Sequence, residues 1–175
     1  MESGQCILGA FTVDPAEELV RIWLEEKGYF TMANRRIKGG KEIDLLAIKP
    51  DGDKLWVEVH VPIKPLGRLR GPRHKAARYS KLPLSERIKG IVECKFDQEK
   101  SEFVKKKLKG EPRKMFVFGD TGGDDEKEVV EEFKKHGIEA ISFKKILAEL
   151  EETLKKRTYM DPTRRYFQLL SKYLT

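Results

Sequence analysis

The stretch GKEIDLLAIKPDGDKLWVEVHV, residues 40–61, decides the fold that the sequence predicts. It lies across two apolar runs, 42–49 and 54–63, which we predict to be strands because they are rich in apolar, β-branched and aromatic residues. The sequence PDGD separates the two runs, and an Asp-Gly pair between apolar runs is typical of the turn of a β-hairpin. The stretch is therefore predicted to form two antiparallel strands.

Carboxylates interrupt both of these strands, Asp44 in the first and Glu58 in the second. A carboxylate within an apolar strand is costly unless another group compensates it, and two on paired strands can converge on one oxygen-lined metal site. Glu58 and His60 are two residues apart, so their side chains are expected on the same face of the strand. Glu17, in the first predicted helix, is a further candidate acid, and Glu18 is the alternative to it.

Each of these residues also has an ordinary structural interpretation. Asp44 and Glu58 could form salt bridges at a strand edge, Glu17 could be a first-turn helix acid, and His60 could be a core histidine with satisfied hydrogen bonds.

Further elements follow on both sides of the predicted hairpin. Asp14-Pro15 indicates the start of a helix and Gly28 its end, and a strand is predicted over 29–37. Apolar spacing downstream predicts helices near 84–96, 98–109, 124–136, 144–157 and 162–174, with strands over 114–119 and 138–143. We therefore predict a single α/β domain with a mixed sheet flanked by helices. Its α-β-β-β-α-β core occupies about 14–143, with a basic insertion at about 64–89 and extra C-terminal helices at about 144–174.

The composition excludes several classes of protein. The 175 residues include 36 Lys and Arg against 29 Asp and Glu, a net charge of +7. The two cysteines, Cys6 and Cys94, cannot form a disulfide framework or a cysteine-built zinc site. No apolar run reaches the ~18 residues of a membrane span, so we expect a cytoplasmic protein with no membrane partner. The high charge content also suits a thermophilic source.

The positive charge is concentrated in residues 64–89, where nine Lys and Arg stand against one acid, Glu86. This net charge of +8 exceeds that of the whole chain, and the segment also contains Gly and Pro. Such a loop is typical of a phosphate-binding surface, although a solvated loop or a site for an acidic protein are alternatives. The residues expected to bind nucleic acid are Lys64, Arg68, Arg70, Arg73, Lys75, Arg78 and Lys81.

The order of these motifs resembles that of the PD-(D/E)XK nuclease superfamily. A helix carrying Glu17 precedes Gly-x-x-Ile-Asp44, and Glu58-Val59-His60 follows fourteen residues after Asp44. Archaeal Holliday-junction resolvases and Mrr-type restriction enzymes are similar in this order. The resemblance covers residues 14–63 closely and the later elements loosely. It implies a restriction-endonuclease-like fold and a metal-dependent endonuclease in which Asp44 and Glu58 hold Mg²⁺ or Mn²⁺ and Glu17 completes the site.

The third residue of that family motif is usually lysine, and this sequence has His60 in its place. A histidine of ordinary pKa, about 6.5, is mostly neutral at pH 7, so it would not supply the same charge. A second Glu-x-Lys occurs at Glu93-Cys94-Lys95, but that segment is predicted to be helical, where residues two apart face different directions. We therefore favour Glu58-Val59-His60, with Lys64 as a weaker source of an amine.

Two functions fit these observations. One is a metal-dependent nuclease that hydrolyses phosphodiester bonds, with DNA favoured and branched or structured DNA as one form of substrate. The other is a catalytically degenerate protein of the same fold that binds nucleic acid through its basic loop for a partner enzyme. Either could be a homodimer, because Tyr166, Leu170, Tyr173 and Leu174 form a stripe on the last predicted helix.

Overall fold

The structure, a computed structural model, describes residues 14–62, 82–121 and 123–155. Its five-stranded sheet has the order β1-β2-β3-β4-β5. β1, β2 and β3 pair with one another as antiparallel strands, and β4 and β5 run parallel to β3. The mixed sheet of the predicted α/β fold is confirmed. The strands are β1 (Phe30–Arg36), β2 (Glu42–Ile48), β3 (Lys54–His60), β4 (Arg113–Phe118) and β5 (Ile138–Ser142).

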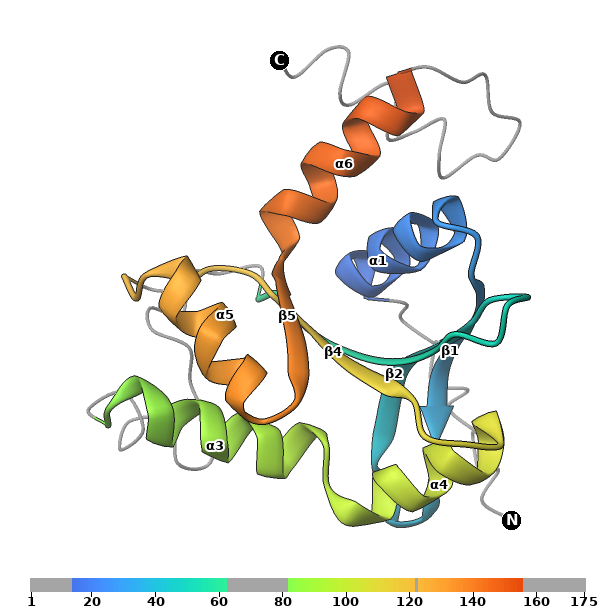
Figure 1. The fold of residues 1–175 in the computed structure, drawn as a ribbon, viewed down its shortest axis with the longest axis horizontal. Coiled ribbons are helices and arrows are strands. Elements are labelled where there is room, and N and C mark those ends of the chain that lie inside the picture. Colours follow the sequence, from blue (N-terminus) through green and yellow to red (C-terminus); the bar gives the residue numbers. More distant parts are fainter. Residues whose placement is uncertain (1–13, 63–81, 122, 156–175) are drawn as a thin grey trace, which may run out of the picture.

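Helices cover both faces of this sheet (Figure 1). On one face lie α1 (Pro15–Glu26) and α6 (Phe143–Lys155). The other face is covered by three helices that come from between β3 and β5. These are α3 (Leu84–Lys95), α4 (Gln98–Leu108) and α5 (Glu126–Lys135). A short 3₁₀ turn, η1 (Lys38–Gly40), joins β1 to β2.

The central strands are buried on both faces, which explains their nearly continuous apolar sequences. In β2 and β3, five of the seven residues are buried. Val57 packs in the layer of α1 and α6, whereas Trp56 packs in the layer of α3, α4 and α5. Full burial of one such side chain contributes about 1.5–3 kcal/mol, so the two layers supply the main stabilisation of the domain.

Helix starts follow the capping rules on which the predictions rest. The Asp14 carboxylate accepts a hydrogen bond from the backbone N–H of Ala16 at 2.8 Å. Asp97 caps α4 in the same way through the N–H of Lys100, at 3.0 Å. After α1, Gly28 has a φ of 85°, a conformation that favours glycine, and this ends the helix where the sequence predicted.

One predicted strand is shorter in the structure, and one predicted helix lies outside the described residues. The strand predicted to reach residue 63 ends at His60, and Pro62 cannot donate a hydrogen bond to continue the ladder. The predicted helix at 162–174, with its dimer stripe, lies outside the described residues. Among the helices that the structure does describe, none has the length and apolar character needed to span a membrane.

Candidate functional site

The candidate site lies where β2 and β3 stop pairing. Their paired register ends at Leu45 opposite Val57. One residue further along, Asp44 Oδ2 accepts a hydrogen bond from the backbone N–H of Val59 at 2.8 Å, so a side chain takes the place of a ladder partner. We call this position the fork, defined by Asp44, Glu58 and the groups that contact them.

The two predicted acids meet at the fork around a lysine amine. Asp44 is 7% exposed and Glu58 is fully buried. The Nζ atom of Lys95, at the C-terminal end of α3, lies 3.1 Å from Asp44 Oδ2 and 3.1 Å from Glu58 Oε2. The lysine therefore screens two carboxylates that would otherwise repel each other in a medium of low polarity.

The other carboxylate oxygen of Glu58 has two donors of its own. Trp56 Nε1 donates to Oε1 at 2.9 Å, and Lys100 Nζ donates to the same atom at 3.1 Å. Trp56 is fully buried, so this tryptophan belongs to the core and does not form a surface for stacking bases. Its ring also packs against Phe96, with ring centroids 4.8 Å apart.

Burial and like charge shift the acid–base behaviour of the fork. Burial, followed by the negative charge of Asp44, raises the pKa of Glu58 to about 7, although Lys95, Lys100 and the Trp56 hydrogen bond oppose the shift. Burial lowers the pKa of the Lys95 ammonium, but the charges of Asp44 and Glu58 outweigh it and the net pKa is raised. Lys95 is therefore a permanent cation at neutral pH.

Glu17 lies on α1, on the other face of the sheet, and the charge of Asp44 affects its pKa. Burial, and then the charge of Asp44, raises the pKa of Glu17 to about 7. Glu18 instead forms an ion pair with Arg21 one turn further along α1. Of the two alternatives, Glu17 is the acid whose pKa depends on the charge of Asp44.

His60 is the last residue of β3 and is half-buried. Strand alternation gives it the same face as Glu58, and its carbonyl accepts a hydrogen bond from Gly119 at 3.0 Å. The amine that contacts both acids comes from Lys95, which the sequence-based prediction ranked below the β3 motif. The catalytic role predicted for His60 stays a prediction. The segment Glu93-Cys94-Lys95 is helical, as predicted, and Glu93 is exposed. Lys95 nevertheless contacts Asp44 and Glu58, so the contact does not involve Glu93.

The positions of Lys95 and Lys100 on the apolar stripes of their helices are a sequence signal for burial. In α3, Lys95 continues the buried stripe of Ile88 and Ile91 at helical spacing. In α4, Lys100 precedes the buried Val104 by four residues. A lysine on the apolar stripe of a helix is costly to bury without a partner, so these positions predict a buried acid opposite them.

The donor set of the fork fits a hard divalent cation. Asp44 and Glu58 present carboxylate oxygens, which Mg²⁺ and Mn²⁺ prefer, and Glu58 Oε2 is buried without a hydrogen bond of good geometry. Mg²⁺ is commonly bound through one or two carboxylates, with water and substrate phosphate completing its coordination. Within the described ranges, no three His, Cys, Asp or Glu side chains gather as a metal cluster, so the chain would supply these two acids.

No protein-family model matches the sequence, and no curated protein matches it. One solved structure is similar, a crystal structure described as a protein of unknown function, AF1548. The identity is 19%, the match covers 73% of this chain and 56% of the other, and the TM-score is 0.40. The chain thus spans a little over half the length of that protein.

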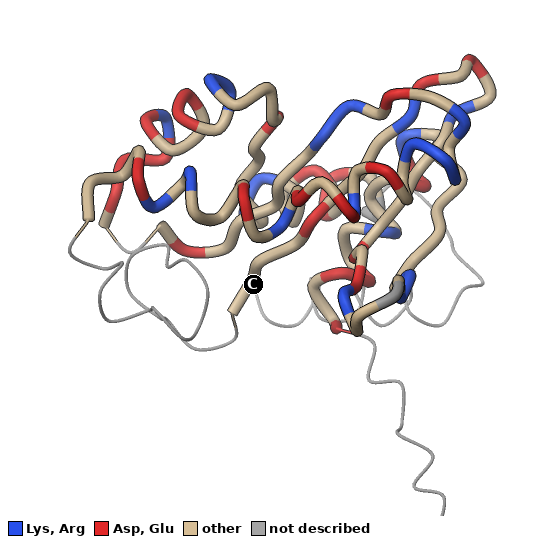
Figure 2. The backbone as a smooth tube through the Cα atoms, turned by 90° about the horizontal axis from the view of Figure 1, so that it is seen from below, with Lys and Arg blue, Asp and Glu red and all other residues tan. Residues whose placement is uncertain are grey.

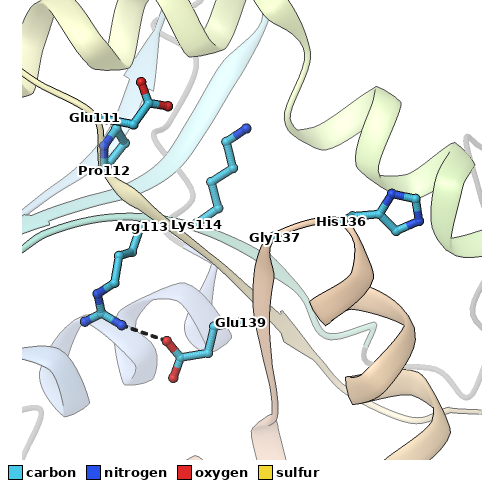
Figure 3. Close-up of a pocket in the computed structure, with 7 residues that line it drawn as sticks. All are labelled: Glu111, Pro112, Arg113, Lys114, His136, Gly137 and Glu139. Atoms are coloured by element: carbon cyan, nitrogen blue, oxygen red, sulfur yellow. Dashed lines mark hydrogen bonds and ion pairs between the residues drawn. The ribbon is translucent and has the colours of Figure 1, made fainter.

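A surface pocket of about 330 Å³ lies at the opposite ends of the parallel strands, at the starts of β4 and β5 (Figure 3). Its charged groups pair among themselves and with neighbours. Arg113 pairs with Glu139 at 2.8 Å and with Asp53 at 2.7 Å, and Glu111 pairs with Lys105 at 2.8 Å. The fork, by contrast, holds a buried carboxylate oxygen, Glu58 Oε2, that has no hydrogen bond of good geometry.

The residues predicted to bind nucleic acid lie outside the described residues; they are Lys64, Arg68, Arg70, Arg73, Lys75, Arg78 and Lys81. Two other basic residues of the segment 64–89 are described. Lys89 is exposed on α3. Arg87 is buried and binds Asp124 through two hydrogen bonds, at 2.7 and 2.8 Å, so its role is to join α3 to the loop before α5. Elsewhere the described chain carries acidic and basic residues interspersed (Figure 2).

Proposed function

We propose that this protein is a divalent-metal-dependent nuclease that hydrolyses phosphodiester bonds, with DNA as the favoured substrate. The observation that carries the proposal is the placing of Lys95 Nζ at 3.1 Å from both Asp44 and Glu58. Two acids and a lysine are the groups that the resemblance to the PD-(D/E)XK nucleases implies for metal-assisted phosphodiester hydrolysis. Structural ion pairs usually lie at the surface, whereas here both acids are buried.

In this proposal, Asp44 and Glu58 hold Mg²⁺ or Mn²⁺ through their carboxylate oxygens. A bound divalent ion lowers the pKa of a water molecule and polarises a phosphoryl oxygen. Added positive charge would favour the ionised form of Glu58, whose pKa is raised first by burial and then by the charge of Asp44.

Lys95 supplies the fixed positive charge of the site. Its side chain is 28% exposed, whereas that of Glu58 is fully buried, so Lys95 is the more accessible of the two to solvent. From this position it can orient the attacking water or contact the phosphate that reaches the fork. It thereby takes the role that the family resemblance assigns to the motif lysine, and His60 is left as an auxiliary group.

Glu17 is suited to accept a proton near neutral pH. A group whose pKa is about 7 is half ionised there, and general bases work best when their pKa is close to the working pH. We propose that it completes the site as an auxiliary acid, because burial, and then the charge of Asp44, raises its pKa.

The basic segment 64–89 is connected to the fork at both ends, which supports nucleic acid as the substrate. β3 leads from Glu58 to His60 and onward into the segment, and α3 returns from it to Lys95. The lysines and arginines of the segment are suited to contact the phosphates of such a substrate. Such contacts give affinity without reading the base sequence.

The test is cleavage of labelled single-stranded, duplex, flapped and four-way-junction DNA in Mg²⁺, Mn²⁺ or EDTA. Asp44→Asn removes the charge but keeps an acceptor for Val59, and Glu93→Gln is the matched control on the surface of α3. We expect metal-dependent cutting by the parent and the control, and none by Asp44→Asn. Binding without cutting by the parent in every metal would instead favour the nucleic-acid-binding alternative.

A further inference from the structure

Lys100 is a buried cation that the proposed mechanism does not use. It is 6% exposed on the first turn of α4, where the Asp97 cap fixes the start of the helix. Its Nζ atom donates to Glu58 Oε1 at 3.1 Å, and Trp56 Nε1 donates to the same oxygen at 2.9 Å. Two elements, α4 and β3, therefore hold one oxygen of one carboxylate.

This arrangement makes the two oxygens of Glu58 unequal. Turning the carboxylate out of this orientation would break both hydrogen bonds at Oε1 and leave two buried donors unpaired, which is costly. The other oxygen, Oε2, is buried, lies 3.1 Å from Lys95 Nζ and has no hydrogen bond of good geometry. Glu58 is thus anchored through one oxygen and presents the other toward the fork.

We propose that Lys100 is a positioning residue that, together with Trp56, fixes Glu58 Oε1 so that Oε2 faces Lys95 and the metal. The inference rests on the proposed function for its metal, but the anchoring of Glu58 is a property of the chain itself. Groups that orient a metal ligand in this way typically change metal affinity by roughly 10–100-fold when they are removed.

The anchoring can be measured without metal through the indole N–H resonances. The chain has two tryptophans, and Trp23 donates to Glu149 at 2.8 Å on the other face of the sheet, so it is an internal control. We expect Lys100→Met to move the Trp56 indole N–H resonance in EDTA and to leave that of Trp23 in place. Lys106→Met, an exposed lysine on the same helix, should move neither.

The second readout is Mn²⁺ binding by isothermal titration calorimetry. Lys100→Met should weaken binding by roughly 10–100-fold, and Lys100→Arg should recover most of it. In a Glu58→Gln background, Lys100→Met should cause no further loss, because Lys100 acts through Glu58. Lys100→Leu, which also lacks a donor, replaces Lys100→Met if circular dichroism shows that the latter has lost its fold.

The outcomes separate this inference from the proposed function. If the parent protein binds no Mn²⁺ but Lys100→Met moves the Trp56 resonance, the metal proposal fails and the positioning role stands. An unchanged Trp56 resonance overturns the positioning role, even if the parent binds Mn²⁺ and cuts DNA. A further loss of Mn²⁺ affinity from Lys100→Met in the Glu58→Gln background also overturns it.

Discussion

Lys95 places one positive charge between two carboxylates that are both removed from water. The two ion pairs, each 3.1 Å, explain how Asp44 and Glu58 can be buried next to each other in the folded protein. Glu17 adds a third acid whose pKa is raised to about 7, chiefly by burial and by the charge of Asp44. The consequences at this scale are a cation on which the proposed catalysis depends and an acid whose pKa is raised toward neutral pH by burial and by the charge of Asp44.

Replacing Lys95 with Met should reduce DNA cleavage by at least ~100-fold, because removing one positioned group that stabilises developing charge typically costs about 10²–10³-fold in rate. Single-turnover rates on the best substrate measure this effect. Glu93→Gln, two residues earlier on the same helix, should cut at the parental rate. A Lys95→Met protein that folds and cuts as fast as its parent would show that the amine has only a structural role.

Replacing Glu17 with Gln should stabilise the protein increasingly as the pH rises. Folding raises the pKa of Glu17 from 4.5 to about 7, so between these values the folded state keeps a proton that the unfolded state has lost. Rising pH therefore lowers the free energy of unfolding of the parent through this group, and glutamine removes that effect. After allowance for solvent screening, we expect a gain of about 1 kcal/mol at pH 8 and little gain at pH 4.5.

Urea unfolding in EDTA at the two pH values measures this difference. Glu126→Gln, an exposed first-turn acid of α5, is the control. A Glu17→Gln stabilisation that is the same at both pH values would contradict the assigned cause.

At the scale of secondary-structure elements, the hairpin and the helix ends were predictable because they depend on local rules. The turn between β2 and β3, the cap at Asp14 and the stop at Gly28 all follow from neighbouring residues. The sequence does not predict Lys95 at the fork, because Lys95 is 51 residues from Asp44 along the chain. Its contact with Asp44 depends on how α3 packs across the sheet, which is a matter of tertiary structure. Helical spacing predicts which apolar residues are buried, but it does not show which lysines on the same stripe meet a buried acid.

The helix α3 and the strand β3 should be interchangeable sources of the amine. His60 follows Glu58 by two residues in β3, so a lysine there would occupy the motif position of the family that the sequence resembles. We expect Lys95→Met/His60→Lys to cut at least ~10-fold faster than Lys95→Met alone, since a restored cation recovers part of the roughly 10²–10³-fold contribution. The comparison needs the His60→Lys single variant as its control, and a double variant no faster than Lys95→Met would refute the exchange.

For the whole molecule, the fork is held by a sheet with helices on both faces. α3 and α4 bring Lys95 and Lys100 to one side, and α1 brings Glu17 to the other. The buried Arg87 guanidinium ties α3 to the loop before α5 through Asp124. Length and apolar patterning were sufficient to predict this layered α/β domain, whereas the assembly of charges at its centre required the tertiary structure.

Divalent metal should stabilise the whole domain if the fork binds it. At a concentration 100 times the dissociation constant, a ligand specific for the folded state adds about 2.7 kcal/mol to the free energy of unfolding. We expect Mn²⁺ to raise the thermal midpoint of the parent reversibly with EDTA, and to leave that of Asp44→Asn unchanged. An equal rise in both proteins would place the metal elsewhere.

The most direct test of the central claim is single-turnover cleavage of DNA by the parent and by Asp44→Asn, with DNA binding measured on the same samples. The proposed mechanism predicts cutting by the parent in Mg²⁺ or Mn²⁺ and none in EDTA. Asp44→Asn should bind DNA at least as well, because a repelling charge has been removed, and should not cut. Equal cleavage rates for the two proteins would contradict the claim that Asp44, Glu58 and Lys95 form the active site.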